Sequence, residues 1–338
     1  MPSIELPSSE VLQHLVDVHC HPTDAPLISS ESMHNLDITI CAMSSKASDQ
    51  RLVYKLAKSY PQKVVPCFGY HPWFSHLICL RGDISKEDHY RELFCPTQND
   101  EDLQVLNTLL EDLPDPITLD SIITELRSNF HEFPNAMLGE VGLDRAFLIP
   151  YDYNASPRKL TPFTVPLKHQ EMILQVQMDL AVELGRNISL HSVKSHQPTM
   201  ELLARMESKH GTDRWNGVSL DLHSCGFSPE MLKDIQRRYP NTFLSLSTVI
   251  NGRSPNHLSL IKVCDPLRIL VESDYNDVDY CTEQTWDMVR TVADIKGWSI
   301  ETEWNSEDDS SQRGVVRRLE ENWVRFKSGN HTRKKQTR

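Results

Sequence analysis

The sequence lacks both an apolar stretch long enough to cross a membrane and a leader for export. The 338 residues contain no apolar run of the roughly 18 residues that a transmembrane helix needs. A signal peptide has basic residues followed by an apolar block, whereas the first ten residues here contain two glutamates and no basic residue. We therefore expect a protein of the cytoplasm, the nucleus or both, with no membrane association.

Paired cysteines and an excess of positive charge are also missing. The 8 cysteines are scattered and form no Cys-x-x-Cys pair, so we expect buried thiols and not a disulfide framework. The formal net charge is -12 and the pI is near 5.7, so the field of the whole protein repels nucleic acid. A phosphate-containing substrate must therefore be held locally, by metal ions or by a small basic patch.

Strands and helices alternate along most of the chain. Short apolar segments typical of buried strands are separated by amphipathic helical segments or by irregular insertions. The eight expected strands are Val16 to His21, Asp37 to Met43, Lys63 to His71, Ala136 to Val141, Asn187 to Leu190, Gly217 to Leu222, Thr242 to Ser247 and Leu267 to Glu272. This order predicts an α/β fold, a (β/α)8 TIM-type barrel in which residues 1–327 form a single domain.

Two segments interrupt the alternation, at about 76–135 and 145–164, and we expect both to be insertions on the barrel rim. The first contains Arg81 to Asp115, whose acidic, proline-containing composition predicts a mobile element that offers little to a core. Such a segment can present a surface to a protein partner, although a charge run is more often simply solvated. Residues 328–338 end in the basic segment Arg333 to Arg338, which suits a nuclear signal, a DNA contact or a disordered end.

The stretch from Val16 to Pro22 (VDVHCHP) carries the first candidate ligands. His19 and His21 are two residues apart, so on a strand both imidazoles point to the same face. Pro22 cannot donate to a strand ladder, so the strand should end near it and leave both histidines at its carboxyl end. An isolated His-x-His pair is at least as often structural as metal-binding, and the rest of the chain decides between these interpretations.

Further residues of metal-binding type follow the later strands. Each is expected at the carboxyl end of a different strand, the rim where barrel enzymes carry their catalytic residues. Any one of them alone indicates little, because single histidines and aspartates at strand ends are commonly structural. Together they predict a site for two divalent ions that share Glu140 and activate a water molecule for hydrolysis. The expected ligands are His19, His21, Glu140, His191, His223 and Asp274.

Six motifs, in this order, resemble those of the TatD family of metal-dependent deoxyribonucleases, which are relatives of the amidohydrolases. They are Asp17-Val-His-Cys-His21, Gly69-Tyr-His-Pro72, Gly139-Glu-Val-Gly-Leu-Asp144, Leu190-His-Ser192, Leu222-His-Ser-Cys-Gly226 and Val271-Glu-Ser-Asp274. The match runs from about residue 15 to residue 326. The chain resembles a divergent eukaryotic member of this family with insertions.

The resemblance implies a role for each candidate ligand. His19 and His21 would hold the first metal ion, and Glu140 would bridge the two ions. The second ion would be held by His191 and His223. Asp274 would act both as a ligand and as the base that takes the proton of the attacking water.

Two more residues are candidate substrate contacts. The family places a substrate-facing histidine at the position of His71, although packing under Trp73 would explain this residue equally well. An arginine usually follows the His-Ser pair, and here Val193 takes that place with Lys194 beside it. The loop Tyr275 to Tyr280 is acidic where the family often has a His-Arg-Gly segment. Both departures weaken phosphate binding and leave the metal centre intact.

The leading functional interpretation is a divalent-metal-dependent hydrolase of phosphodiester bonds, specifically a 3'-5' DNA exonuclease. It would act on DNA or oligonucleotide ends, with Glu140 and Asp274 as catalytic residues and Mg, Mn or Zn as the metal. One alternative is an amidohydrolase-like enzyme for an ester, amide or phosphate compound other than nucleic acid. Another is an interaction protein on a barrel scaffold, but a scaffold has no need of an intact ligand set.

Overall fold

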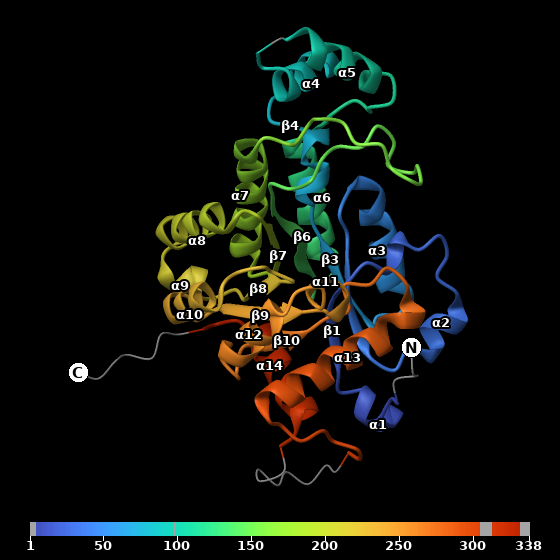
Figure 1. The fold of residues 1–338 in the computed structure, drawn as a ribbon, viewed down its shortest axis with the longest axis vertical. Helices are drawn as coiled ribbons and strands as arrows, with labels where there is room; N and C mark the ends of the chain where they lie inside the picture. The colour runs from blue at the N-terminus through green and yellow to red at the C-terminus, as the bar shows by residue number, and fades with distance from the viewer. Residues whose placement is uncertain (1–4, 98, 305–312, 332–338) are drawn as a thin grey trace, which may run out of the picture.

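The computed structural model describes residues 5–97, 99–304 and 313–331, and it shows a nearly closed barrel of parallel strands surrounded by helices (Figure 1). The strands are β1 (Val16–Cys20), β2 (Thr39–Met43), β3 (Val64–Phe68), β6 (Met137–Asp144), β7 (Ile188–Val193), β8 (Leu220–His223), β9 (Thr242–Leu246) and β10 (Ile269–Val271). They pair in this order. The predicted (β/α)8 barrel is confirmed, because all eight expected strands form.

Helices cover the outside of the barrel and occupy its two ends. They are α1 (Ser9–Leu12), η1 (Pro22–Asp24), α2 (Ser30–Asn35), α3 (Ala47–Ser59), η2 (Pro72–Leu77), α4 (Lys86–Phe94), α5 (Asp100–Leu110), α6 (Leu119–Glu132), α7 (Leu167–Leu184), α8 (His196–His210), α9 (Thr212–Trp215), α10 (Pro229–Arg238), α11 (Thr248–Asn251), α12 (Asn256–Val263), α13 (Val278–Lys296) and α14 (Val315–Ser328). The short strands β4 (Ile78–Cys79) and β5 (Ile117–Thr118) pair separately. Within the described residues, no helix combines the length and the apolarity of a membrane span.

The amino-terminal end of the barrel is closed by α14. Trp323 and Phe326 of this helix join the interior cluster that includes Phe243 of β9. The hydroxyl of Ser219, just before β8, donates to the carbonyl oxygen of Phe326 at 2.5 Å. The opposite, carboxyl end is therefore the one that can carry a site. The basic segment Arg333 to Arg338 lies outside the described residues.

The two expected insertions pack together. α4 and α5 project from the barrel at the top of Figure 1, above the loop that follows β6. Tyr90 and Phe94 of α4 and Leu106 of α5 are buried against Ile149 and Phe163 of that loop. We call residues 86–97, 99–110 and 145–165 the rim module. The expectation that the acidic segment offers little to a core is wrong, because its apolar side chains share a core with the second insertion.

The last part of the expected first insertion belongs to the barrel. α6 packs against α7 and β3, and its residues Ile122, Leu126 and Phe130 are buried in the main core. Prolines precede α6, so the sequence does not show clearly where the insertion ends and the barrel resumes. The spacing of these three residues along one helix face is nevertheless that of a helix packed on a sheet. The part of the segment that departs from the barrel is thus shorter than 76–135.

Candidate metal centre

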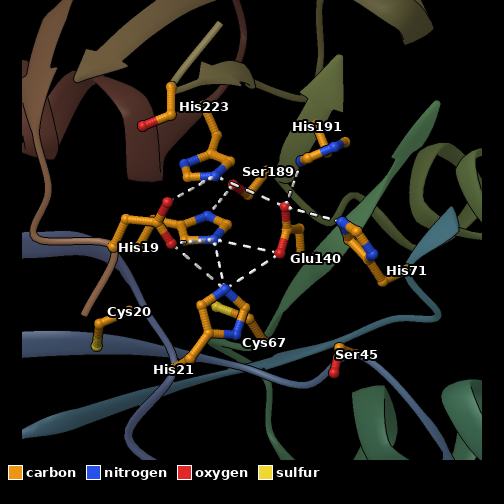
Figure 2. A network of polar contacts seen from close by, with 12 residues as sticks. His19, Cys20, His21, Ser45, Cys67, His71, Glu140, Ser189, His191 and His223 are labelled. Atoms are coloured by element: carbon orange, nitrogen blue, oxygen red, sulfur yellow. Dashed lines mark hydrogen bonds and ion pairs between the residues drawn. The ribbon is translucent and has the colours of Figure 1, made fainter. Parts of the chain in front are cut away.

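Histidine and carboxylate side chains converge around Glu140 at the carboxyl end of the barrel (Figure 2). Its carboxylate oxygen Oε2 lies 3.1 Å from Nε2 of His21 and 3.5 Å from Nε2 of His19. The other oxygen, Oε1, lies 2.9 Å from Nδ1 of His191 and 3.6 Å from Nε2 of His223. The two oxygens of Glu140 therefore face different pairs of imidazoles.

Asp274 lies across the same cluster. Its Oδ1 is 3.6 Å from Nε2 of His21, and its Oδ2 is 3.7 Å from Nε2 of His223. The backbone N–H of Asp274 donates to the carbonyl oxygen of His19 at 3.0 Å, where the end of β10 meets β1. The structure thus brings together all six residues that the sequence predicted as metal ligands.

The two residues predicted to contact substrate are placed differently from each other. Nε2 of His71 lies 3.3 Å from Oε1 of Glu140, and its ring also meets Trp73 edge-on with the centroids 4.9 Å apart. His71 therefore packs against Trp73 and also reaches the cluster. Lys194 is exposed just beyond β7 and forms no ion pair with the described residues of the cluster. Contact with substrate stays a prediction for both residues.

Glu140 and His191 lie well inside their strands and not at the ends. Glu140 is the fourth residue of β6 and His191 the fourth of β7, because these strands stay paired as far as Asp144 and Val193. The extra length of β6 carries the chain from the cluster to the rim module. Asp274 has a φ of 51°, a conformation that is uncommon for residues with a side chain and that is concentrated at functional sites.

Burial and close contacts between charged groups shift the pKa values of the residues in the cluster. Burial alone would raise the pKa of Glu140, but the charges of His71 and His19, together with hydrogen bonds from histidines, hold that pKa well below its ordinary value. Burial alone would lower the pKa values of His21 and His191, but hydrogen bonds to carboxylates raise each pKa to about 9. Without a cation, protons therefore occupy nitrogen atoms that a cation would use at neutral pH.

The donor set fits divalent cations. Imidazole nitrogens and carboxylate oxygens are the ligands that zinc, manganese and similar ions take in proteins. Glu140 belongs to two groups of three donor atoms that lie within 4.8 Å of one another, one with His19 and His21 and the other with His71 and His191. The carboxylate is thus placed between two sets of imidazoles, as a bridging ligand would be.

The nearest neighbours of His223 are His19 and Glu272, and not His191, with which it is expected to share a cation. Its ring stacks on that of His19, with the centroids 3.4 Å apart and the planes 4° from parallel. Its Nδ1 lies 2.9 Å from Oε2 of Glu272, so Nε2 is the atom left to face the cluster. The sharing of one cation by His191 and His223 stays a prediction.

Glu272 is one of three residues that support the cluster and that the sequence reasoning missed. Oγ of Ser189 lies 2.8 Å from Nδ1 of His19, and Oδ2 of Asp144 lies 3.2 Å from Nε2 of His191. Such partners fix the tautomer and the ring orientation of metal-binding histidines. Asp144 and Glu272 lie inside the family motifs, where they could have been found. Ser189 could have been inferred from its place two residues before His191 on the same face of β7.

The comparison with known proteins places this site in a family. The profile of the TatD related DNase family matches residues 16–306. The Cut9-interacting protein scn1 of Schizosaccharomyces pombe is 29% identical over 333 residues, covering 86% of this chain and 95% of the relative. An uncharacterized deoxyribonuclease of Saccharomyces cerevisiae is 28% identical over 327 residues, covering 93% of this chain and 99% of the relative.

A solved structure shows the same fold. The crystal structure of a TatD homologue from Escherichia coli superposes with a TM-score of 0.58 at 16% identity, covering 93% of this chain and 98% of that chain. The family match extends over every strand of the barrel and over all the residues that converge on Glu140. The chain therefore belongs to the TatD related DNase family of metal-dependent hydrolases.

Proposed function

We propose that the protein is a two-metal phosphodiesterase that removes nucleotides from the 3' end of DNA. The observation that carries this proposal is the position of Glu140, whose two oxygens face separate pairs of imidazoles. A carboxylate in that position can bridge two cations, and paired cations suit displacement at a phosphodiester. Membership of the DNase family supports DNA as the substrate class.

Four histidines and two carboxylates would have separate roles in the reaction. His19 and His21 would hold one cation, and His191 and His223 the other, with Glu140 between them. When bound, the cations would lower the pKa of a water molecule and neutralise charge on the scissile phosphate.

Asp274 would take the proton of the attacking water. Its two oxygens lie between His21 and His223, and its side chain remains 13% exposed, whereas that of Glu140 is 5% exposed. Asp274 can therefore meet both a bound water and solvent, which a general base must do to pass its proton on. Glu140 is enclosed by imidazoles and is better suited to bridge.

The test combines metal analysis with a nuclease assay on the full chain. Protein supplemented with manganese should contain two cations and should shorten 5'-labelled single strands from the 3' end. The double variant His19→Ala/His21→Ala should contain one cation fewer. Absence of bound metal, or no release of nucleotides with any of manganese, magnesium and zinc, would contradict the proposal. Efficient cutting of closed circular duplex would contradict action from an end.

A second candidate function is the binding of a protein partner through the acidic segment. Residues 81–115 contain ten acidic and three basic residues, and one relative is named as a Cut9-interacting protein. Most of the acidic side chains of α4 and α5 are exposed, so a basic surface could approach them. Replacing Glu87, Asp88, Asp100 and Glu101 with glutamine should weaken capture of such a partner from cell extract. Capture that is unchanged and insensitive to salt would contradict an electrostatic interface.

A further inference from the structure

Two stacked aromatic side chains lie beside the cluster. Trp73 comes from η2 and Phe147 from the loop after β6, and their rings stack with the centroids 4.7 Å apart and the planes 12° from parallel. The indole of Trp73 also meets the rings of His71 and His191 edge-on, at 4.9 and 6.4 Å. The stacked pair therefore lies in contact with His71 and His191, which surround Glu140.

A single buried carboxylate holds this pair in place. Oδ2 of Asp144 accepts a hydrogen bond from Nε1 of Trp73 at 2.7 Å and lies 3.2 Å from Nε2 of His191. Oδ1 of Asp144 accepts hydrogen bonds from the backbone N–H groups of Ala146 and Phe147, at 2.6 and 3.0 Å. The aromatic pair is thus already ordered relative to His191, and a ligand would not have to order it on binding.

Core packing accounts in part for the position of Phe147 but not for that of Trp73. The aromatic core of the rim module consists of Tyr90, Phe94 and Phe163, which are buried. Both rings are half-buried. Phe147 packs against the core of the rim module, whereas Trp73 is outside the hydrophobic clusters formed by the described residues. The only polar atom of the Trp73 side chain is engaged by Asp144, and the indole remains partly exposed, so part of its apolar surface can contact a ligand.

We propose that Trp73 and Phe147 form a stacking site for an unpaired nucleobase next to the scissile phosphate, an inference that rests on the proposed phosphodiesterase function. Every base has an aromatic face, so the site accepts single strands of any sequence. A base-paired end would have to open before it could enter.

Stacking also explains how an acidic protein can hold a polyanion. The net charge of -12 opposes binding through many phosphate contacts. Aromatic contacts with bases add affinity that does not depend on positive charge. Binding should therefore depend on the terminal bases more than on the length of the strand.

The test uses steady-state kinetics of the full chain with manganese on two single-stranded oligonucleotides, one intact and one abasic at its last two 3' positions. We expect KM for the abasic strand to be about tenfold higher, with a smaller change in kcat. Phe147→Leu keeps an apolar side chain but removes the ring face, so it should raise KM about tenfold for the intact strand only. Phe147→Tyr should restore the wild-type KM.

A matched control and a binding measurement complete the test. Tyr151→Leu makes the matched change in the same loop, where the ring packs against the core of the rim module and contacts Lys159, and it should leave both KM values unchanged. Oligothymidylate with calcium should quench the tryptophan fluorescence of the wild-type protein. The quenching should be lost in Trp73→Phe and should need about tenfold more oligonucleotide in Phe147→Leu.

The outcomes separate the stacking site from the proposed function. Equal KM values for the two strands, or no effect of Phe147→Leu, would overturn the stacking site and leave the phosphodiesterase in place. If the wild-type protein cleaves neither strand, the proposed function fails and the fluorescence titration decides alone. In that case, quenching that depends on Phe147 supports a nucleobase site, and absence of quenching overturns it.

Discussion

The buried carboxylate of Glu272 lies 2.9 Å from Nδ1 of His223. Glu272 is 0% exposed, and its oxygens also accept hydrogen bonds from the hydroxyls of Ser224 and Ser245. Burial alone would raise the pKa of this carboxyl, but the charge and the hydrogen bond of His223 lower it. The ionised carboxylate thus holds one proton of His223 on Nδ1, so Nε2 is the nitrogen that binds a cation once its own proton has left.

Replacing this carboxylate should weaken metal binding. Glu272→Gln keeps the shape but removes the charge that fixes His223, and we expect the affinity for one cation to fall about 10- to 100-fold. Isothermal titration calorimetry measures the affinity, and circular dichroism checks the fold. Glu230→Gln on the exposed face of α10 is the matched control. An unchanged affinity in Glu272→Gln would show that His223 is oriented by its stacking on His19 instead.

Asp274→Asn should stop turnover and leave the fold intact. The amide cannot take a proton from water, and loss of a general base typically lowers kcat about 100- to 10,000-fold. The measurement is kcat on a single-stranded oligonucleotide, with thermal unfolding and metal content recorded for the same variant. Asp279→Asn, an exposed position in the first turn of α13, is the control. A near-normal rate would assign the base to another group.

Metal binding should release protons at neutral pH. Hydrogen bonds and charges of carboxylates outweigh burial and raise the pKa values of His21 and His191 to about 9 and that of His223 to about 10, from 6.5. A cation must displace these protons, so its apparent affinity should rise with pH up to about 9 to 10 and then level off. Calorimetry in two buffers of different ionisation enthalpy counts the released protons.

The same histidines should make the stability of the metal-free protein fall as the pH rises, whereas the affinity for metal rises. A pKa raised on folding contributes stability that is fully present below pH 6.5 and is lost as the pH rises through 9 to 10. Denaturant unfolding of the metal-free protein at several pH values measures this loss. His34→Gln, an exposed position, should release as many protons as the wild-type protein on binding metal. Proton release and affinity that do not depend on pH would contradict the expectation for metal binding, and a stability that does not fall as the pH rises through 9 to 10 would contradict the expectation for the metal-free protein.

A cavity in the core of the rim module should increase the local opening of the module and leave the metal content of the site unchanged. Leu106 of α5 is 0% exposed and packs in the core shared with the loop after β6. Leu106→Ala should cost about 2–5 kcal/mol, because a buried cavity replaces the side chain. Hydrogen exchange in the rim module should accelerate, with unchanged metal content. Leu160→Ala, at a position that is 51% exposed, is the control. Unchanged exchange in Leu106→Ala would show that the module does not depend on this core.

The barrel and the residues of the candidate site could be predicted from the sequence for a simple reason. Parallel strands are covered on both faces, so each reads as a short apolar run, and all carboxyl ends of the strands meet at one rim. Residues that follow such runs, such as His21 and Asp274, are therefore brought together by the topology alone. The sequence determined which side chains meet, in which order along the rim, and that they suit divalent cations.

Only the tertiary structure decided how the rim is built. Phe94 and Phe163 stack 5.0 Å apart although 69 positions separate them, and no local pattern records such a pair. The acidic residues of α4 and α5 lie on exposed faces and dominated the composition, which concealed the apolar face beneath. Asp144 likewise reads as one residue of a motif, whereas its contacts with Trp73 and His191 exist only after η2, β6 and β7 have packed. Contacts between distant segments depend on packing geometry, which the periodicity of a single segment does not encode.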